Sequence, residues 1–358
     1  MRMAEAKSAV VGRRYRRSRR LRRTRRAVVA VVGTLLALLV FFALFGVFLT
    51  QYVPVWMTEN ESVFSDQAAT SFALLKSDVD AQYSLGGPAS YVTPFVMSSQ
   101  AVPLLAQPTQ AQLTFLPNNC PGNFTANGAP KVPSACVFQR VVMNVNTTVK
   151  PFQDHPFNQT SAVALFQMFL PNRYYPTVGY VFEDDAVFQT QLGGHQTVAD
   201  PPPLNITKVG SNTTVQTSFL ELFGNSTSYT GQGSKDVFTH LEFTQPVSSL
   251  GHFETVSRAP IPFNLTYEVG TRNVCGWYSF LHTLAVTSGL TSYSSLSPPA
   301  PPTPGYNLTT SFSPVPPSSS VCINSGAATY DLTLIVYNVS YATLAYAGVQ
   351  LGLSQGGS

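Results

Sequence analysis

The densest group of residues that could do chemistry is the acidic run Glu183-Asp184-Asp185, flanked by Phe182 and Ala186. Its carboxylates offer the oxygen ligands that Ca²⁺ prefers, although calcium loops normally alternate acidic ligands with other residues. A hairpin turn between the apolar segments 180–182 and 187–189 accounts for the acids equally well. We favour the turn, and the sequence leads us to assign no metal ligand and no cofactor.

Other reactive side chains are scattered. The five histidines show neither a zinc-protease spacing nor a paired Cys/His pattern; they are His155, His195, His240, His252 and His282. Ser226 lies in Gly-Asn-Ser-Thr-Ser, which lacks the second glycine of a nucleophile elbow. We interpret all of them as surface or strand residues, and we expect a protein that is not an enzyme.

Modification sites are more numerous than reactive ones. Ten Asn-x-Ser/Thr sequons indicate a glycosylated exterior: Asn60, Asn123, Asn146, Asn158, Asn205, Asn212, Asn225, Asn264, Asn307 and Asn338. An even number of cysteines in an exported segment favours two disulfides; the cysteines are Cys120, Cys136, Cys275 and Cys322. Spacing leaves three connectivities open, and we favour Cys120 with Cys136 and Cys275 with Cys322, because each pair brackets a Pro-rich loop.

The charge is divided along the chain, and this division places the modification sites on one side of a membrane. Residues 1–26 carry 12 basic residues and one acidic residue, whereas the remaining residues carry a net charge of −7. The 23 residues from 27 to 49 hold no charge and are long enough, as a helix, to cross a hydrocarbon core. Tyr52 and Trp56 suit the outer boundary. The positive-inside rule predicts a cytoplasmic N-terminus and an extracellular segment beginning at residue 50.

After the apolar segment the sequence predicts a second, amphipathic helix within residues 50–84. Apolar residues recur at steps of four and three, and charged residues fall mostly between them; the stripe is Phe64, Ala68, Phe72, Leu75 and Val79. We expect Pro54 to interrupt the helix at its start and the turn Leu85-Gly-Gly-Pro88 to end it. The stripe must be covered by another part of the chain.

Residues 85–358 are predicted to be β-rich, and the fold class is mainly β, most simply an antiparallel sandwich. Alternating patterns predict strands near 91–97, 111–116, 141–146, 178–182, 186–191, 213–223, 236–244, 263–269 and 329–341. Further helical periodicity is confined to 161–169. In the last strand the alternation changes phase near 335–337, which indicates a β-bulge or a segment buried on both faces. The Pro/Ser-rich stretch 297–320 is expected to be an extended loop.

The arginine tract from Arg13 to Arg26 has several interpretations. Binding of nucleic acid is disfavoured, because a tract held at a bilayer is poorly placed to reach DNA. Attraction to anionic lipids of the inner leaflet contributes about 1 kcal/mol per basic residue, so we favour lipid anchoring and topology. A twin-arginine export signal at 18–21 is weakened by Arg22, which stands where an apolar residue is usual.

A further interpretation rests on a resemblance. A basic leader, the apolar run "RRAVVAVVGTLLALLVFFALFGVFL", an amphipathic helix and a β-rich exterior resemble archaeal type IV pilin-like surface proteins, in particular large archaeal single-pass membrane proteins. The segments "RYYPTVGYVFEDDAVFQ" and "YDLTLIVYNVS" are similar to that group in order along the chain. The resemblance implies cleavage between Arg26 and Ala27. A glutamate common five residues into mature pilins is absent, since Val31 and Val32 stand there.

These observations predict a membrane-anchored surface protein with a structural, adhesion or interaction role, whose partners are the bilayer and proteins of the envelope. A subunit of a pilus-like filament, processed near Ala27, is the alternative, and an exported hydrolase is a third. The low charge of the outer portion, 25 charged residues among 309, also leads us to expect tolerance of acid.

Overall fold

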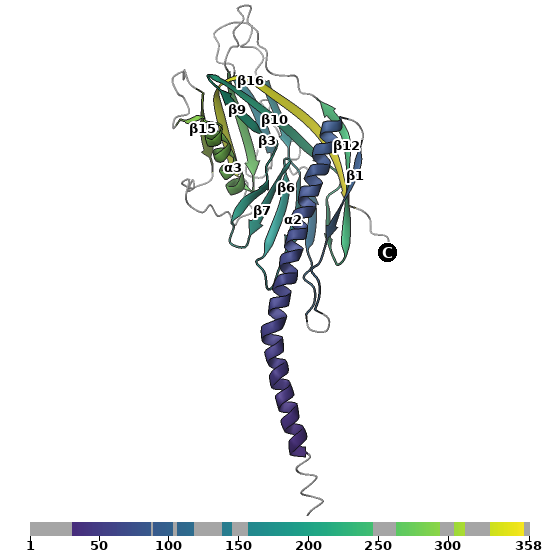
Figure 1. Cartoon of the computed structure of the whole chain (residues 1–358). Coiled ribbons are helices and arrows are strands. Elements are labelled where there is room, and N and C mark those ends of the chain that lie inside the picture. The colour runs from purple at the N-terminus through teal and green to yellow at the C-terminus, as the bar shows by residue number, and fades with distance from the viewer. Residues whose placement is uncertain are drawn as a thin grey trace, which may run out of the picture. The chain divides into compact units, whose positions relative to one another are not determined.

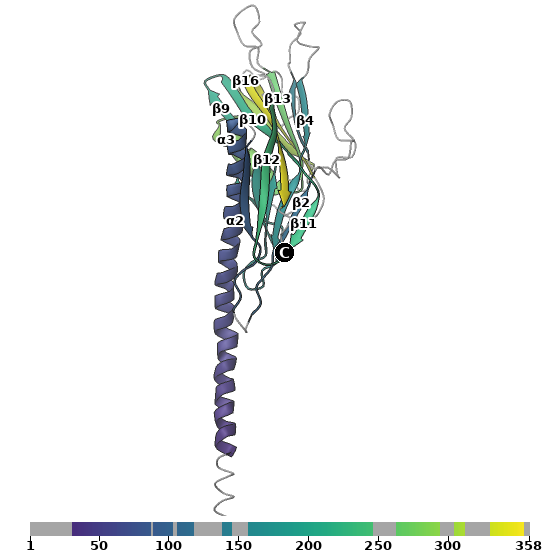
Figure 2. The same ribbon diagram turned by 90° about the vertical axis from the view of Figure 1, so that its right-hand side faces the viewer.

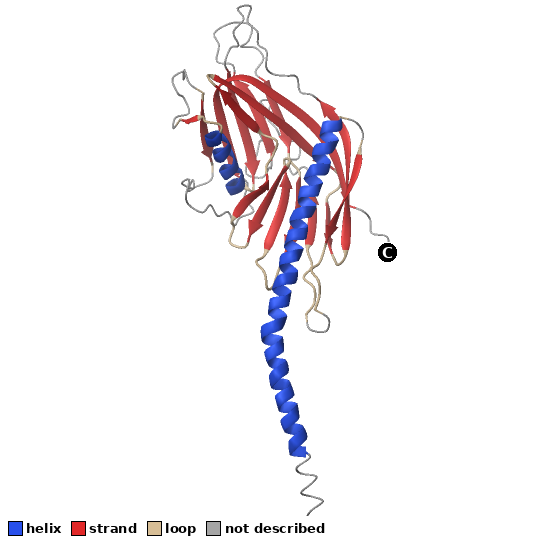
Figure 3. Cartoon of the chain, viewed as in Figure 1, coloured by secondary structure: helices blue, strands red, loops and turns tan. Residues whose placement is uncertain are grey.

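The computed structural model describes residues 31–86, 89–102, 106–117, 138–144, 157–245, 263–293, 304–311 and 330–353. It is mainly β, with an apolar helix near the N-terminus followed by antiparallel and mixed sheets (Figures 1 and 3). The chain divides into two compact units: residues 1–58 with 102–107, and residues 59–101 with 108–358.

The N-terminal helix runs without a break from Val31 to Leu85. The expected interruption at Pro54 is absent. Pro54 has no N–H to donate, and the turn before it, η1 (Phe48–Tyr52), is π-helical, with the Val53 N–H donating to the Phe48 carbonyl. Helix α2 (Val53–Leu85) then continues and ends where the sequence predicts: the Gly86 N–H donates to the Gln82 carbonyl, and Gly86 has a φ of +62°.

The first unit contains the apolar part of this helix. One helix of the described chain is long and apolar enough to cross a membrane, and none of its most apolar window is buried. Phe41, Phe42 and Leu44 are each at least 58% exposed. At the C-terminal end of this apolar part, Phe48 contacts the rings of Tyr52 and Trp56 at centroid distances of 5.7 and 5.6 Å.

The second unit contains the strands, in two sheets. The ten-stranded sheet follows the order β1-β12-β16-β13-β3-β4, with β10 and β15 also on β16, β9 on β10 and β14 on β15. Its strands are β1 (Ser90–Val96), β3 (Phe138–Asn144), β4 (Phe157–Ala162), β9 (Asn205–Val209), β10 (Asn212–Phe223), β12 (Ser234–Gln245), β13 (Phe263–Thr271), β14 (Thr291–Ser292), β15 (Gly305–Thr310) and β16 (Tyr330–Leu353).

The six-stranded sheet follows the order β11-β2-β5-β6-β7-β8. Its strands are β2 (Gln112–Leu116), β5 (Leu165–Leu170), β6 (Val178–Glu183), β7 (Ala186–Gln191), β8 (Gln196–Asp200) and β11 (Thr227–Thr230). All of its pairings are antiparallel. The helical periodicity at 161–169 is therefore misleading, because the residues there form the end of β4 and most of β5.

Strand β16 connects the two halves of the larger sheet. Its first half pairs with β13 and β15, and its second half pairs with β10 and β12. The predicted phase change is a β-bulge: Phe263 pairs with Val339 but Leu265 with Val336, and Asn338 within the bulge has a φ of +61°. The pairing of β10 with β16 is parallel, so a purely antiparallel sheet is not what forms.

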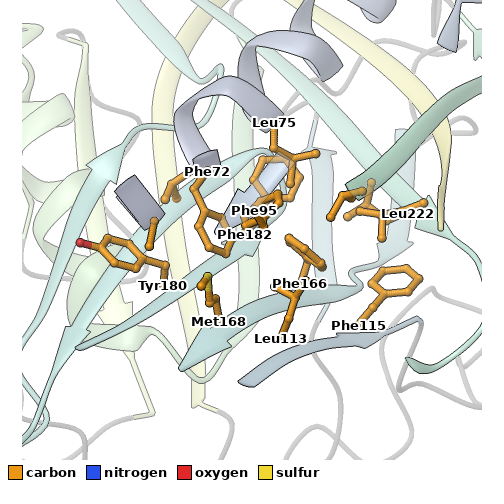
Figure 4. Close-up of a cluster of buried hydrophobic side chains, with 14 of the residues drawn as sticks. Phe72, Leu75, Phe95, Leu113, Phe115, Phe166, Met168, Tyr180, Phe182 and Leu222 are labelled. Atoms are coloured by element: carbon orange, nitrogen blue, oxygen red, sulfur yellow. The ribbon is translucent and has the colours of Figure 1, made fainter. Parts of the chain in front are cut away.

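Side chains of both sheets and of α2 share one core. The predicted helix stripe is buried, with Phe64, Ala68, Phe72, Leu75 and Val79 each at most 1% exposed. Phe72 contacts the rings of Phe95, Phe166 and Tyr180 at centroid distances of 5.2 to 5.8 Å (Figure 4). Figure 2 shows the C-terminal half of α2 running alongside β12. The stripe is thus covered by the β-strands that follow it in sequence.

A second core forms under helix α3 (Val274–Thr287), which the sequence pattern did not lead us to expect. The buried positions Val274, Trp277, Leu281 and Ala285 face strands β13 and β16. Their spacing of three and four residues is a helical signal within a segment of only 14 residues. Gly276 permits the close approach of this helix to β7, since a Cβ there would lie 2.6 Å from the Phe188 ring.

The Pro/Ser-rich stretch 297–320 is not entirely a loop. Residues Gly305–Thr310 form β15, which pairs antiparallel with residues 332–337 of β16. Tyr306 is buried at 4% exposure and Leu308 packs against the second core. Alternating apolar residues therefore outweigh the surrounding prolines over these six residues.

Candidate functional site

The acidic run Glu183-Asp184-Asp185 forms the predicted hairpin turn. Glu183 and Ala186 close the β6–β7 pair, and Asp184 and Asp185 occupy left-handed backbone conformations with φ of +50° and +57°. Two consecutive positive φ values are the signature of a type I′ turn, in which aspartate is among the tolerated residues. The three residues are at most 4% exposed, although turn acids usually face water.

Each carboxyl group of the turn has a different partner. Glu183 accepts hydrogen bonds from Asn273 Nδ2 at 2.7 Å and from Trp277 Nε1 at 3.3 Å. Asp184 Oδ2 accepts a hydrogen bond from the Tyr267 hydroxyl at 3.4 Å. The run therefore ties the six-stranded sheet to β13 and α3.

Asp185 contacts helix α2 through Lys76. The Lys76 Nζ lies 3.4 Å from Asp185 Oδ2 and 3.1 Å from Asp80 Oδ2. The Lys76 and Asp185 side chains are 7% and 6% exposed, so this ion pair is buried. Burial lowers the pKa of Lys76, but the carboxylates of Asp185 and Asp80 outweigh burial and leave the pKa raised.

Burial also dominates the acids. It raises the pKa of Asp184 well above the usual aspartate value, and the neighbouring Glu183 adds to the rise. It raises the pKa of Asp185 similarly, although Lys76 offsets part of the effect. The pKa of Glu183 is raised by burial and partly restored by hydrogen bonds from Thr271, Asn273 and Trp277.

The surroundings of the turn are protein. Among the residues that the structure describes, no three His, Cys, Asp or Glu side chains converge as metal ligands. Each carboxyl group is enclosed and has at least one oxygen on a protein partner, so the turn joins elements of the fold.

Glu61 is a further buried acid, for which the sequence pattern indicates no role. It lies on the buried side of α2 at 0% exposure. Its carboxylate accepts hydrogen bonds from the backbone N–H groups of Arg173, Tyr174 and Tyr175 at 2.7 to 3.1 Å. The Thr109 hydroxyl donates a further bond at 2.5 Å. Consecutive N–H groups around one anion form a backbone nest, which Glu61 fills.

A hollow on the six-stranded sheet is the candidate binding site. Its volume is about 350 Å³, within the range of small-molecule sites. It is lined by side chains of β5, β6 and β7, by the turn at 191–194 and by Arg272 and Asn273. The side chains of Gln167, Phe169 and Val181 lie on the face opposite the core residues Phe166, Met168 and Phe182.

The reactive residues singled out in the sequence do not meet at this hollow. His240 Nδ1 lies 2.8 Å from the Ser90 Oγ on adjacent strands, and His282 stacks on Tyr278 at a centroid distance of 6.2 Å. His195 and Ser226 are exposed. His155 and His252 lie outside the described residues, as do Arg26 and Ala27.

The sequons differ in their surroundings. Asn205, Asn212 and Asn225 are exposed, and Asn60, Asn264 and Asn338 are half-buried. Asn307 is 5% exposed, so its amide is not accessible to a glycosyltransferase once β15 has folded. Asn158 lies in β4, and Asn123 and Asn146 are outside the described residues.

Of the cysteines, the structure describes Cys275. It is buried in α3 and disulfide-bonded. Cys120, Cys136 and Cys322 lie outside the described residues, so the pairing favoured above stays a prediction.

Comparisons with known proteins identified no related protein. No protein-family model matches the chain, and no curated protein and no solved structure matches it. The function must therefore be inferred from this chain's own residues.

Proposed function

We propose that the chain is a single-pass membrane protein whose β-rich portion faces the exterior and acts in adhesion or interaction at the cell surface. The observation that carries the proposal is that the two halves of one continuous helix differ in their exposure. Its apolar half exposes Leu35, Leu39 and Phe42 at 58% or more, whereas its outer half buries its stripe in the β core. A helix that is apolar on all sides and uncovered by protein requires lipid around it.

The charge and the aromatic residues support the orientation. The net charge of +11 in residues 1–26 favours the cytoplasmic side, where it also meets anionic lipid. Phe48, Tyr52 and Trp56 cluster at the other end of the apolar segment, as residues of a membrane–water boundary do. We infer that the two sheets and the outer half of α2 form a sandwich-like domain outside the membrane.

An alkaline extraction of membranes tests the anchor. The protein is expected to stay in the membrane pellet at alkaline pH, and Leu39→Arg is expected to reduce membrane integration, because arginine at a helix centre costs about 3 kcal/mol. Glu59→Arg is the matched control, as Glu59 is exposed on the helix beyond the apolar segment. Release of the native protein by alkali would contradict the proposal.

A pilus-like subunit processed at Ala27 is the second candidate. It is favoured by the unbroken helix, whose uncovered apolar half offers a surface to identical helices as well as to lipid. N-terminal sequencing of native protein separates the candidates: a chain beginning at Ala27 supports the subunit, and an intact arginine tract excludes it.

A further inference from the structure

The hollow on the six-stranded sheet has a floor that is kept open by one glycine. Gly179 pairs with Phe169 of β5 on one side and with Thr190 of β7 on the other. A Cβ at this position would lie 2.7 Å from Thr190 Oγ1. The side chain of Phe169, which is 47% exposed, therefore stands beside a low floor and presents its surface to solvent.

The walls of the hollow are fixed by hydrogen bonds. The Gln196 side chain accepts from the Cys275 N–H at 3.1 Å and donates to the Arg272 carbonyl at 3.1 Å. The Asn273 amide is held by Glu183. These bonds hold the segment that carries Arg272 against the edge of the sheet.

One further amide in the lining belongs to Gln167. Its side chain lies on the hollow face of β5, and within the described part of the chain this side-chain amide has no hydrogen-bond partner. The amide can donate and accept at once, which suits a hydroxyl group. The hydroxyl of Thr177 lies in the same lining.

Among the described residues that line the hollow, one side chain is ionisable, that of Arg272. A guanidinium carries five N–H donors in a planar fork that matches a carboxylate. The charge of Arg272 also acts on the buried Glu183 behind the lining. The described lining thus combines an aromatic surface, amides, hydroxyls and one cation.

We propose that this hollow binds an acidic saccharide. The apolar C–H face of a pyranose ring stacks on Phe169, a ring hydroxyl bonds to Gln167, and the ring carboxylate pairs with Arg272. An acidic peptide is disfavoured, because it has no pyranose face to stack on Phe169. Such binding rests on the proposed surface function and names the class of its partner.

Isothermal titration of the full chain in nanodiscs tests the proposal. The probes are tri-galacturonate, its fully methyl-esterified form, which lacks the charge, and tri-glutamate, which lacks the rings. We expect saturable binding of tri-galacturonate and about tenfold or more weaker binding of the other two, since a charge-assisted bidentate pair is among the stronger polar contacts. Absence of saturable binding, or equal binding of the ester or the peptide, would overturn the proposal.

Variants locate the site. Phe169→Ala and Arg272→Gln are each expected to weaken binding of tri-galacturonate by about tenfold. Phe238→Ala and Arg173→Gln are matched controls, because Phe238 is 43% exposed on β12 and Arg173 is exposed outside the hollow. Fluorescence of the buried Trp277 reports whether each variant is folded. If Arg272→Gln does not fold, the binding measured for Phe169→Ala decides whether the hollow is the site.

If Phe169→Ala leaves the binding of tri-galacturonate unchanged, this hollow is excluded as the binding site. Such a failure is distinct from failure of the proposed surface function, since the latter is decided by membrane extraction and by accessibility of the domain on cells.

Discussion

Replacement of Glu61 is expected to destabilise the β-rich unit more than any other single change of an acid on α2. The carboxylate satisfies four donors, namely the Thr109 hydroxyl and three consecutive backbone N–H groups. Hydrogen bonds to a charged group contribute about 1.5–3 kcal/mol each. Arg173 and Tyr174 are exposed, so water can hydrate part of the nest after Glu61→Ala. We therefore expect a loss of about 4 kcal/mol, below the sum of the four bonds.

Glu61→Gln separates charge from shape. Glutamine has the same size and keeps one acceptor oxygen, but its NH₂ group faces N–H donors that it cannot satisfy. The expected loss is about 2 kcal/mol, intermediate between wild type and alanine. If glutamine were as stable as glutamate, the nest would not depend on an anion.

The assay is urea unfolding of the full chain in nanodiscs. The chain has two tryptophans, and Trp277 is fully buried. A Trp56→Phe background leaves Trp277 as the reporter of the domain. Glu59→Gln is the matched control: it removes the same charge from an exposed position on the same helix, and its effect is expected within about 0.5 kcal/mol. Equal effects at both positions would refute the reasoning.

The remaining predictions use the same assay. Phe72→Ala removes a ring at 0% exposure and is expected to cost about 4 kcal/mol; a cost below about 1 kcal/mol would contradict the shared core. Lys76→Met is expected to cost about 3 kcal/mol by leaving Asp185 without its counter-charge, and an unchanged urea midpoint would contradict it. Burial raises the folded-state pKa of Asp184 and Asp185, so the folded state binds these two protons more tightly than the unfolded chain does. This difference adds to the free energy of unfolding in full below about pH 3.9, and the added stability is lost as the pH rises through the raised pKa values. Asp185→Asn is expected to reduce the difference in urea midpoint between about pH 4 and pH 7, and an unaltered difference would argue against the assignment.

Local patterns allow the prediction of the elements that bury one face. The stripe Phe64 to Val79 and the end of α2 at Leu85 follow from spacing and from Gly86. The β6–β7 hairpin and the bulge at Asn338 also follow from local sequence, because each is encoded within a few residues. Most of the nine strands that we predicted from alternation are present, with bounds that agree to within a few residues.

Features that depend on distant partners could not be predicted in this way. The parallel pairing of β10 with β16 joins residues that are distant in sequence, such as Thr217 and Leu344. The nest around Glu61 requires a loop at 173–175 that nothing near Glu61 specifies. The hollow arises because Gly179, Phe169 and Arg272 come from three separate segments, so their types alone do not indicate a site.

Helix α3 was missed for a different reason. Its pattern is helical, yet Gly276 and the β-branched Val274 and Thr287 lower its intrinsic helix propensity. Packing of Trp277 against Phe188 and Tyr267, at centroid distances of 5.4 and 6.3 Å, stabilises it. Tertiary contact therefore outweighs local preference in this segment.

The buried turn acids give a physical basis for the expected acid tolerance. A folded domain that binds protons more tightly than its unfolded chain gains stability as pH falls. Asp184 and Asp185 act in this direction, and the low overall charge limits repulsion between the remaining groups.

The accessibility of two tags on intact cells tests the central claim most directly. One epitope tag is placed before residue 1 and the other in the exposed turn at Gly210, which joins β9 to β10. A single-pass protein with an outward β domain binds antibody at Gly210 on intact cells and at the N-terminus only after permeabilisation. Antibody binding at the N-terminus of intact cells, or at Gly210 only after permeabilisation, would contradict the proposed topology.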